Sequence, residues 1–178
     1  LRLVEGLEYD TIYHEHLSYL TVRALYGFLA RCNFRLFDVQ QVGIHGGSLR
    51  CFADRWTRPP HPTVPTLIAQ ESFAWVIDIG YGALRLWVLR DFADRIHAHR
   101  RALVSTLDGL KREGKRIAGL SAPAKGMTLL NTARIGTDLL EFLTEKNPLK
   151  IGRYAPGSRL PILEDAALHG VRYAELRW

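Results

Sequence analysis

The 178-residue sequence has few cysteines and no long apolar run. No stretch approaches the roughly 20 consecutive apolar residues that a membrane-spanning helix requires, so we expect no membrane partner. The two cysteines, Cys32 and Cys51, lie far from any CxxC spacing and follow no signal peptide, which favours a reduced, cytoplasmic protein. Proline and glycine usage is ordinary, which excludes collagen-like and disordered classes. These absences leave a globular protein of one or two domains.

The net charge of +6 is concentrated in one segment of the chain. Residues 85–116 carry nine basic and four acidic side chains. Apolar residues recur among them at helical spacing, which predicts one long amphipathic helix that ends near Glu113. A solvated basic helix face explains the charge, and no nucleic-acid-binding motif accompanies it, so we expect no nucleic-acid partner.

Local patterns in the first third of the chain predict a helix and a hairpin. The helical pattern runs from about Ser18 to Arg31, and period-two alternation follows over residues 34–42 and 48–54. Four prolines between Arg58 and Pro65 are incompatible with a helix interior or a central strand. We therefore expect a domain boundary in this segment.

The rest of the chain alternates between helix and strand. A helix over about residues 66–81 and the basic helix are followed by a strand at 115–122, a helix at 128–135, a strand at 139–144 and a strand near 160–163. The strand–helix–strand order predicts a βαβ unit and an α/β fold.

Four consecutive residues, Tyr13, His14, Glu15 and His16, combine a phenol, two imidazoles and a carboxylate. In such a set an imidazole can take a proton from a carbon beside a carbonyl, a carboxylate can fix its tautomer, and a phenol can donate to the enolate oxygen. A polar loop with a histidine at a helix N-terminus explains the same residues equally well. The i, i+2 spacing of the histidines, without a third ligand nearby, argues against a metal site.

The segment from Ser121 to Gly126 lies between a predicted strand and a predicted helix. Backbone N–H groups and the helix dipole favour phosphate at such a turn, and Lys125 would add a cation, so a nucleotide or diphosphate is the natural ligand. The segment matches neither the GxGxxG nor the P-loop pattern, and an ordinary turn is the alternative.

Two further polar loops contain candidate ligand contacts. At the predicted hairpin turn, His45 precedes two glycines that would let the main chain approach a ligand, although such turns need glycine in any case. Asn147, Lys150 and Arg153 lie in a loop bounded by glycine and proline, where they can hold a sugar or phosphate or face solvent.

Several motifs occur in one order along the chain. They are DTIYHEH at 10–16, FDV at 37–39, HGGSLR at 45–50, APAKG at 122–126, TLLN at 128–131, NPLK at 147–150, GRY at 152–154 and PG at 156–157. Together they resemble the C-terminal part of the S-adenosylmethionine-dependent sugar C-methyltransferases, which methylate a carbon of a keto-deoxysugar carried on a nucleoside diphosphate. The likeness covers nearly the whole chain.

The resemblance implies an enzyme of three parts: a small zinc-binding domain, a doubly wound methyltransferase domain and a Rossmann-like C-terminal α/β domain that helps to hold the nucleotide sugar. Residues 1–58 would be the tail of the methyltransferase domain, and residues 65–178 the C-terminal domain. The zinc ligands and most of the S-adenosylmethionine site would lie upstream of Leu1. We therefore expect this chain to be part of a longer enzyme and to hold no metal itself.

The same resemblance implies roles for individual residues. His16 would be the general base that removes the proton beside the keto group, with Tyr13 and Glu15 supporting it or the enolate. The residues expected to bind substrate are His45, Lys125, Gly126, Asn131, Asn147 and Arg153. The family's apolar terminal strand is replaced here by a segment with Glu175 and Arg177, which predicts an exposed edge strand or a truncated piece.

Two other functions can be compared with this one, and the sequence leaves the first of them open. The isolated chain can be a nucleotide-sugar-binding module without catalysis, because the methyl-donor site would lie elsewhere. A histidine-based hydrolase would need a metal or a nucleophile, and the sequence offers neither. We expect part of a C-methyltransferase for a nucleoside-diphosphate keto-deoxysugar, with no turnover by the chain alone.

Overall fold

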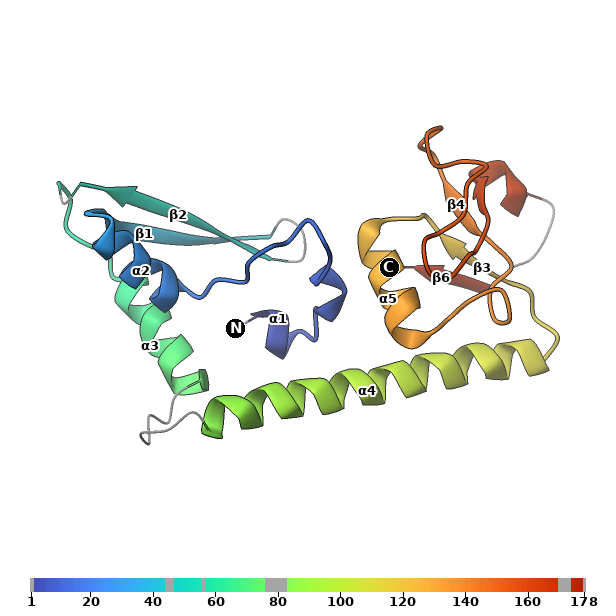
Figure 1. Cartoon of the computed structure of the whole chain (residues 1–178), viewed down its shortest axis with the longest axis horizontal. Helices are drawn as coiled ribbons and strands as arrows, with labels where there is room; N and C mark the ends of the chain where they lie inside the picture. The colour runs from blue at the N-terminus through green and yellow to red at the C-terminus, as the bar shows by residue number, and fades with distance from the viewer. Residues whose placement is uncertain (1, 44–46, 56, 76–82, 170–173, 178) are drawn as a thin grey trace. The chain divides into compact units, whose positions relative to one another are not determined.

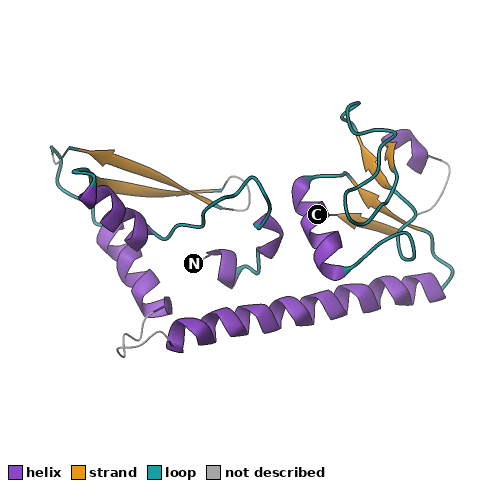
Figure 2. Ribbon diagram, in the orientation of Figure 1, coloured by secondary structure: helices purple, strands orange, loops and turns teal. Residues whose placement is uncertain are grey.

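A computed structural model describes residues 2–43, 47–55, 57–75, 83–169 and 174–177. The chain forms two compact units, and one of the three points at which it passes from one unit to the other falls within a long helix. Unit 1 comprises Leu1–Glu8 and Ser18–Ala93, and unit 2 comprises Tyr9–Leu17 and Asp94–Trp178. Helices and strands are mixed along the chain, which confirms the α/β class (Figures 1 and 2).

Unit 1 is built around a two-stranded antiparallel hairpin. The strands pair from Arg35 opposite Asp54 to Val42 opposite Ser48, with an irregularity between Leu36 and Asp38. The elements of this unit are α1 (Arg2–Glu5), α2 (Val22–Arg31), β1 (Arg35–Val42), β2 (Ser48–Asp54) and α3 (Thr63–Trp75). The predicted hairpin is therefore confirmed, while the predicted helix before it begins at Val22 rather than near Ser18.

The core of unit 1 lies between α2, α3 and one face of the hairpin. Its buried members are Val22, Leu36, Val39 and Val64. Glu71 of α3 is also buried and accepts the N–H groups of Val22 and Arg23 at 2.7 and 2.9 Å, so that it caps the start of α2.

The helix that follows the proline-rich segment begins earlier in the chain than the sequence predicted. The helix α3 begins at Thr63 and contains Pro65 in its first turn. Proline is tolerated there because the N–H groups of the first turn have no partner within the helix. The last residues of the predicted helix, 76–81, lie outside the described residues.

Unit 2 contains a four-stranded parallel sheet with the strand order β5-β4-β3-β6. Its strands and main helix are β3 (Ile117–Leu120), α5 (Ala124–Ala133), β4 (Leu143–Glu145), β5 (Ile162–Glu164) and β6 (Ala174–Arg177). The parallel β3–α5–β4 segment confirms the predicted βαβ unit. β6 lies at one end of this strand order, which agrees with the edge strand, one of the two alternatives that the sequence left for the polar C-terminal segment.

The basic segment forms α4 (Ala83–Arg112), as its helical spacing predicted. Leu103, Val104, Leu107 and Leu110 pack from α4 into the core of unit 2. Buried side chains of α5 and the strands complete that core, among them Leu130, Leu140 and Leu143. In the described part of the chain, no helix combines the length and the apolar character needed to cross a membrane.

Two element boundaries in unit 2 differ from those predicted. The helix α5 begins at Ala124 rather than near Thr128, because Pro123 takes the extended backbone of an N-cap. The strand β4 covers only Leu143–Glu145, because Leu139 and Leu140 form a turn in which both N–H groups bond to the Gly136 carbonyl. Both leucines are buried in this turn, so their apolar run indicates burial and not strand.

Candidate functional site

The four residues from Tyr13 to His16 form a tight turn in unit 2, closed by a hydrogen bond from the His16 N–H to the Tyr13 carbonyl at 3.0 Å. The ring of Tyr13 lies against the imidazole of His16, with centroids 4.3 Å apart. Tyr13 is half-buried, whereas His14, Glu15 and His16 are exposed. The turn therefore presents its imidazoles and its carboxylate to solvent.

One ring nitrogen of His16 is held by the backbone. The Nδ1 atom lies 2.7 Å from the Thr11 carbonyl oxygen, which can only accept a hydrogen bond. The Nδ1 atom must therefore carry a proton, and in the neutral ring Nε2 is left with a lone pair. This is the tautomer that a general base acting through Nε2 requires.

The carboxylate of Glu15 lies beside the imidazole of His14. Its Oε1 lies 4.0 Å from His14 Nε2, and both side chains are largely exposed. The orientation of His16 is set by the Thr11 carbonyl and the Tyr13 ring. A backbone carbonyl thus holds His16, and support of His16 or of the enolate by Glu15 stays a prediction.

The segment before this turn is anchored in unit 2 by Tyr9. Tyr9 is buried at the start of a short 3-10 helix, η1 (Tyr9–Thr11), and its hydroxyl lies 3.0 Å from Nδ1 of His99 on α4. Burial is the main reason that the pKa of Tyr9 is raised, so the phenol stays neutral. Since η1 also packs against α5, the Thr11 carbonyl has a defined position.

The second candidate feature is the β3–α5 loop, Ser121–Pro123, which precedes the first turn of α5. Ser121 has a left-handed backbone conformation (φ 68°), which is uncommon for a residue with a side chain. Its N–H donates to the hydroxyl of Thr144, which is fully buried in β4. A side chain of the neighbouring strand therefore supports this conformation.

The helix α5 starts without a side-chain cap. Pro123 is the N-cap, and the first helical bond runs from the Met127 N–H to the Pro123 carbonyl at 3.1 Å. Lys125 is half-buried and Gly126 buried in the first turn. This end of α5 has the N–H donors and the positive dipole end that suit an anion, and Lys125 adds a positive charge.

The loop after β4 is tied to this region by Lys150. Its Nζ donates to the Ala122 carbonyl at 2.9 Å and to Glu145 Oε2 at 2.9 Å. Burial alone would raise the pKa of Glu145, but hydrogen bonds from Lys150 and from the N–H groups of Lys146 and Asn147 outweigh it and hold this pKa below its ordinary value. The carboxylate is thus charged at neutral pH and holds Lys150 in place.

Asn131 and Asn147 both make hydrogen bonds within the chain. The Nδ2 group of Asn131 on α5 donates to the Pro156 carbonyl at 3.1 Å, and a Cβ at Gly157 would collide with the Asn131 amide. The Oδ1 atom of Asn147 accepts the Leu149 N–H at 3.0 Å. Both side chains therefore have structural contacts beside the ligand roles that the sequence predicts for them.

The remaining predicted substrate residues are Arg153 and His45. Arg153 is exposed, and its backbone carbonyl accepts the Ile162 N–H at 2.8 Å. His45 lies outside the described residues. Lys125 and Gly126 share the first turn of α5, and Arg153 lies in the loop that begins after β4.

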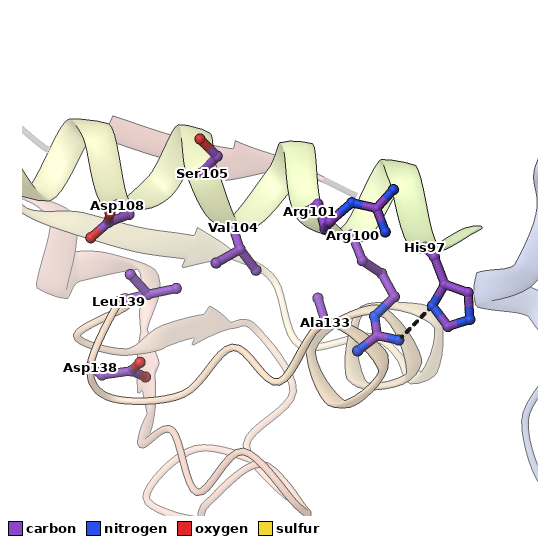
Figure 3. Close-up of a pocket in the computed structure, with 9 residues that line it drawn as sticks. All are labelled: His97, Arg100, Arg101, Val104, Ser105, Asp108, Ala133, Asp138 and Leu139. Carbon is purple, nitrogen blue, oxygen red and sulfur yellow. Dashed lines mark hydrogen bonds between the residues drawn. The ribbon is translucent and has the colours of Figure 1, made fainter. Parts of the chain in front are cut away.

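A groove of about 570 Å³ runs along α4 in unit 2 (Figure 3). It is lined by His97, Arg100, Arg101, Val104, Ser105, Asp108, Ala133, Asp138 and Leu139. At one end Nη1 of Arg100 donates to Nδ1 of His97 at 3.3 Å (Figure 3). None of the residues that the sequence predicts for catalysis or substrate binding lines this groove.

Comparison with known proteins agrees with the motifs. Residues 43–173 match the model of a family described as the C-methyltransferase C-terminal domain. The chain is 34% identical to the C-methyltransferase NovU of Streptomyces niveus, in an alignment that covers 95% of the chain and 40% of that protein. The chain belongs to the C-methyltransferase family. The expected family is thus confirmed, and the chain spans two fifths of the length of this relative.

Three groups that position the candidate site were not predicted from the sequence. The Thr11 carbonyl is a backbone atom, which no sequence pattern marks. Tyr9 meets His99 across 90 residues, and Lys150 meets Ala122 across 28 residues. The NPLK motif at residues 147–150 drew attention to Lys150, but the sequence alone placed this lysine only as a ligand contact or a surface residue.

Proposed function

We propose that this chain supplies the general base and the nucleotide-sugar site of an S-adenosylmethionine-dependent C-methyltransferase that acts on a nucleoside-diphosphate keto-deoxysugar. The observation that carries the proposal is the hydrogen bond between His16 Nδ1 and the Thr11 carbonyl, which leaves Nε2 as a proton acceptor. The exposed position of His16 supports it, since a substrate must reach this nitrogen. The two free thiols, Cys32 and Cys51, agree with a cytoplasmic enzyme.

In this proposal, His16 Nε2 removes the proton from the sugar carbon beside the keto group. The positive charge that develops on the imidazole is stabilised by the Thr11 carbonyl at Nδ1 and by the Tyr13 ring beside it. The hydroxyl of Tyr13 can donate to the enolate oxygen. Glu15 contributes negative charge near the ring.

The diphosphate of the substrate is assigned to the first turn of α5. The N–H donors and dipole of this helix end and the charge of Lys125 favour an anion there. The contact of η1 with α5 supports this assignment, because it puts the segment that leads to His16 and the proposed anion site into one unit. A substrate held by its diphosphate at α5 would have its sugar free to reach toward the Tyr13–His16 turn.

The described residues do not fit a binding site for S-adenosylmethionine. The turn after β3 reads Ser-Ala-Pro-Ala-Lys-Gly and has no glycine-rich loop. An acidic side chain near the end of the second strand would have to bind the ribose, but Glu145 at this position is bound to Lys150. We therefore assign the methyl donor to the part of the enzyme that this chain does not cover.

The strand order β5-β4-β3-β6 supports the finer fold assignment. The chain runs from the inner strand β3 through α5 to β4 and then outward to β5, while β6 pairs with the other side of β3. This order is found in doubly wound sheets. We infer that the sheet of unit 2 is the Rossmann-like C-terminal domain, and that the hairpin of unit 1 is the tail of the methyltransferase domain. The domain limits 1–58 and 65–178 remain a prediction.

Calorimetry on the 178-residue chain tests the binding half of the proposal. The chain is expected to bind thymidine diphosphate and to show no saturable binding of S-adenosylmethionine at micromolar concentrations. A chain that binds this diphosphate and not the donor acts by itself as a nucleotide-sugar-binding module, the alternative that the sequence leaves open. Saturable binding of the donor would contradict the assignment of its site to another part of the enzyme.

Solvent exchange of the sugar proton tests the catalytic half. In an enzyme that includes the methyl-donor domain, the hydrogen beside the keto group should exchange with deuterium from the solvent when His16 is present. Exchange that persists at the same rate in a folded His16→Ala variant would rule out His16 as the base.

A further inference from the structure

We propose that Lys150 is a positioning residue for the diphosphate site: it fixes the β3–α5 loop by its contact with the Ala122 carbonyl, and does not bind the anion itself. This inference rests on the proposed nucleotide-sugar site at α5. It assigns to the lysine a task different from that of Lys125, although both are cations near the same loop.

The geometry of Lys150 is that of a tether between two segments. Its Nζ is shared between a backbone carbonyl of the β3–α5 loop and the carboxylate of Glu145, each at 2.9 Å. Glu145 is in turn held by the N–H groups of Lys146 and Asn147, at 2.9 and 3.3 Å. The ammonium group thus has its strongest hydrogen bonds directed at the protein.

The position of the tether explains how it would act on the anion site. Ala122 precedes Pro123, the N-cap of α5, so the Ala122 carbonyl lies next to the helix end that would receive the phosphate. Bound to Lys150, this carbonyl oxygen is fixed and its partial negative charge is neutralised. Without Lys150, the oxygen is free to turn toward the anion and repel it.

The β3–α5 loop has a second tether. The effect of losing Lys150 on binding can therefore be measured apart from its effect on folding. The Ser121 N–H is bound to the buried Thr144 hydroxyl, next to Glu145 in the same strand. The two tethers therefore hold adjacent residues of the loop, Ser121 and Ala122. Loss of Lys150 should therefore loosen the loop while the Thr144 contact keeps it in place.

Glu145 distinguishes positioning from direct binding. If Lys150 binds the diphosphate directly, Glu145→Gln removes a competing negative charge and the affinity for the anion rises. If Lys150 acts as a tether, the single carbonyl oxygen of glutamine cannot serve both the backbone N–H groups and Lys150, so the loop loosens and the affinity falls. The two mechanisms predict changes of opposite sign.

The experiment measures the affinity of the chain for thymidine diphosphate by calorimetry, together with thermal melting. Lys150→Met should weaken binding about 10-fold, and Glu145→Gln should weaken it in the same direction, because each removes a charged hydrogen bond of the tether. Lys146→Met is the matched control: Lys146 lies in the same loop, its side chain is 89% exposed, and its Nζ lies 3.9 Å from Asp165. It should bind as the wild type does.

Each outcome decides the inference. Weaker binding in Lys150→Met and Glu145→Gln, with Lys146→Met unchanged, supports the tether. A rise in affinity in Glu145→Gln, or equal losses in Lys150→Met and Lys146→Met, overturns it while leaving the nucleotide site in place. Absence of binding by the wild-type chain overturns the nucleotide site and, with it, this role of Lys150.

Discussion

In the Tyr13–His16 turn, the exposed imidazole of His16 is held by a backbone carbonyl, whereas in the β3–α5 loop the backbone is held by side chains from another strand and loop. His16 is oriented by the Thr11 carbonyl, five residues earlier in the chain. The Ser121 N–H and the Ala122 carbonyl are oriented by Thr144 and Lys150, which follow them by 23 and 28 residues. The orientation of His16 thus depends on a contact that is local in the sequence, whereas the conformation of the β3–α5 loop depends on the packing of the sheet.

Because of this difference, variants of the Tyr13–His16 turn and variants of the β3–α5 loop contacts measure different properties. A side chain that points into solvent can be replaced in the Tyr13–His16 turn without loss of buried contacts, so its variants report on the reaction. The groups that hold the β3–α5 loop are buried or half-buried, so their variants also report on folding. The predictions below test this contrast.

The largest effect is expected for His16→Ala in an enzyme that includes the methyl-donor domain. The kcat value should fall by about 10²–10⁴, because the lost group acts in the transition state, with little change in substrate affinity. The melting temperature should stay near that of the wild type, since the side chain is exposed. His14→Ala is the matched control, and its kcat should stay close to the wild-type value.

Thr144→Val should destabilise the chain without changing the Tyr13–His16 turn. The valine keeps the shape of the buried threonine but removes the acceptor of the Ser121 N–H, which costs about 1–3 kcal/mol of unfolding free energy. Denaturation with urea measures this loss. Thr106→Val, which removes a hydroxyl bound to the Ala102 carbonyl on α4, is the exposed control and should cost clearly less.

Lys125→Ala should weaken the binding of thymidine diphosphate about 10-fold, because one charge-assisted contact with the anion is lost. Calorimetry on the chain gives this value. Lys115→Ala removes an equal charge just before β3, at the end of the strand away from α5, and should bind normally. Equal affinities in Lys125→Ala and the wild type would remove Lys125 from the site.

The smallest effect is expected at the Arg116–Glu141 ion pair. Hydrogen bonds from Arg116 lower the pKa of Glu141 below its ordinary value of 4.5. The pair therefore stabilises the fold above about pH 4.5 and loses this contribution as the pH falls through the lowered pKa. Glu141→Gln should cost no more than about 1 kcal/mol at pH 7 and should flatten the acid limb of a stability profile, whereas Glu113→Gln should do neither.

Much of the fold could be predicted because the spacing of apolar residues along the chain indicates which side chains are buried. Period-two alternation in residues 34–42 and 48–54 indicated the hairpin, and the spacing of Leu103, Leu107 and Leu110 indicated α4. The pattern failed at Leu139 and Leu140, because a buried turn and a buried strand show the same apolar run. It also missed the start of α5, which Pro123 sets by its extended backbone.

The candidate site could likewise be predicted only in part from the sequence. The residue types indicate which chemistry is available: the imidazoles, carboxylate and phenol of residues 13–16, the cation Lys125 at a helix start, and the order of motifs that marks the C-methyltransferase family. The contacts of the folded chain show that a carbonyl sets the His16 tautomer, that Tyr9 is anchored to His99, and that Lys150 holds Ala122. The reason is physical: residue types fix which groups can donate or accept, whereas the chain path fixes which of them meet.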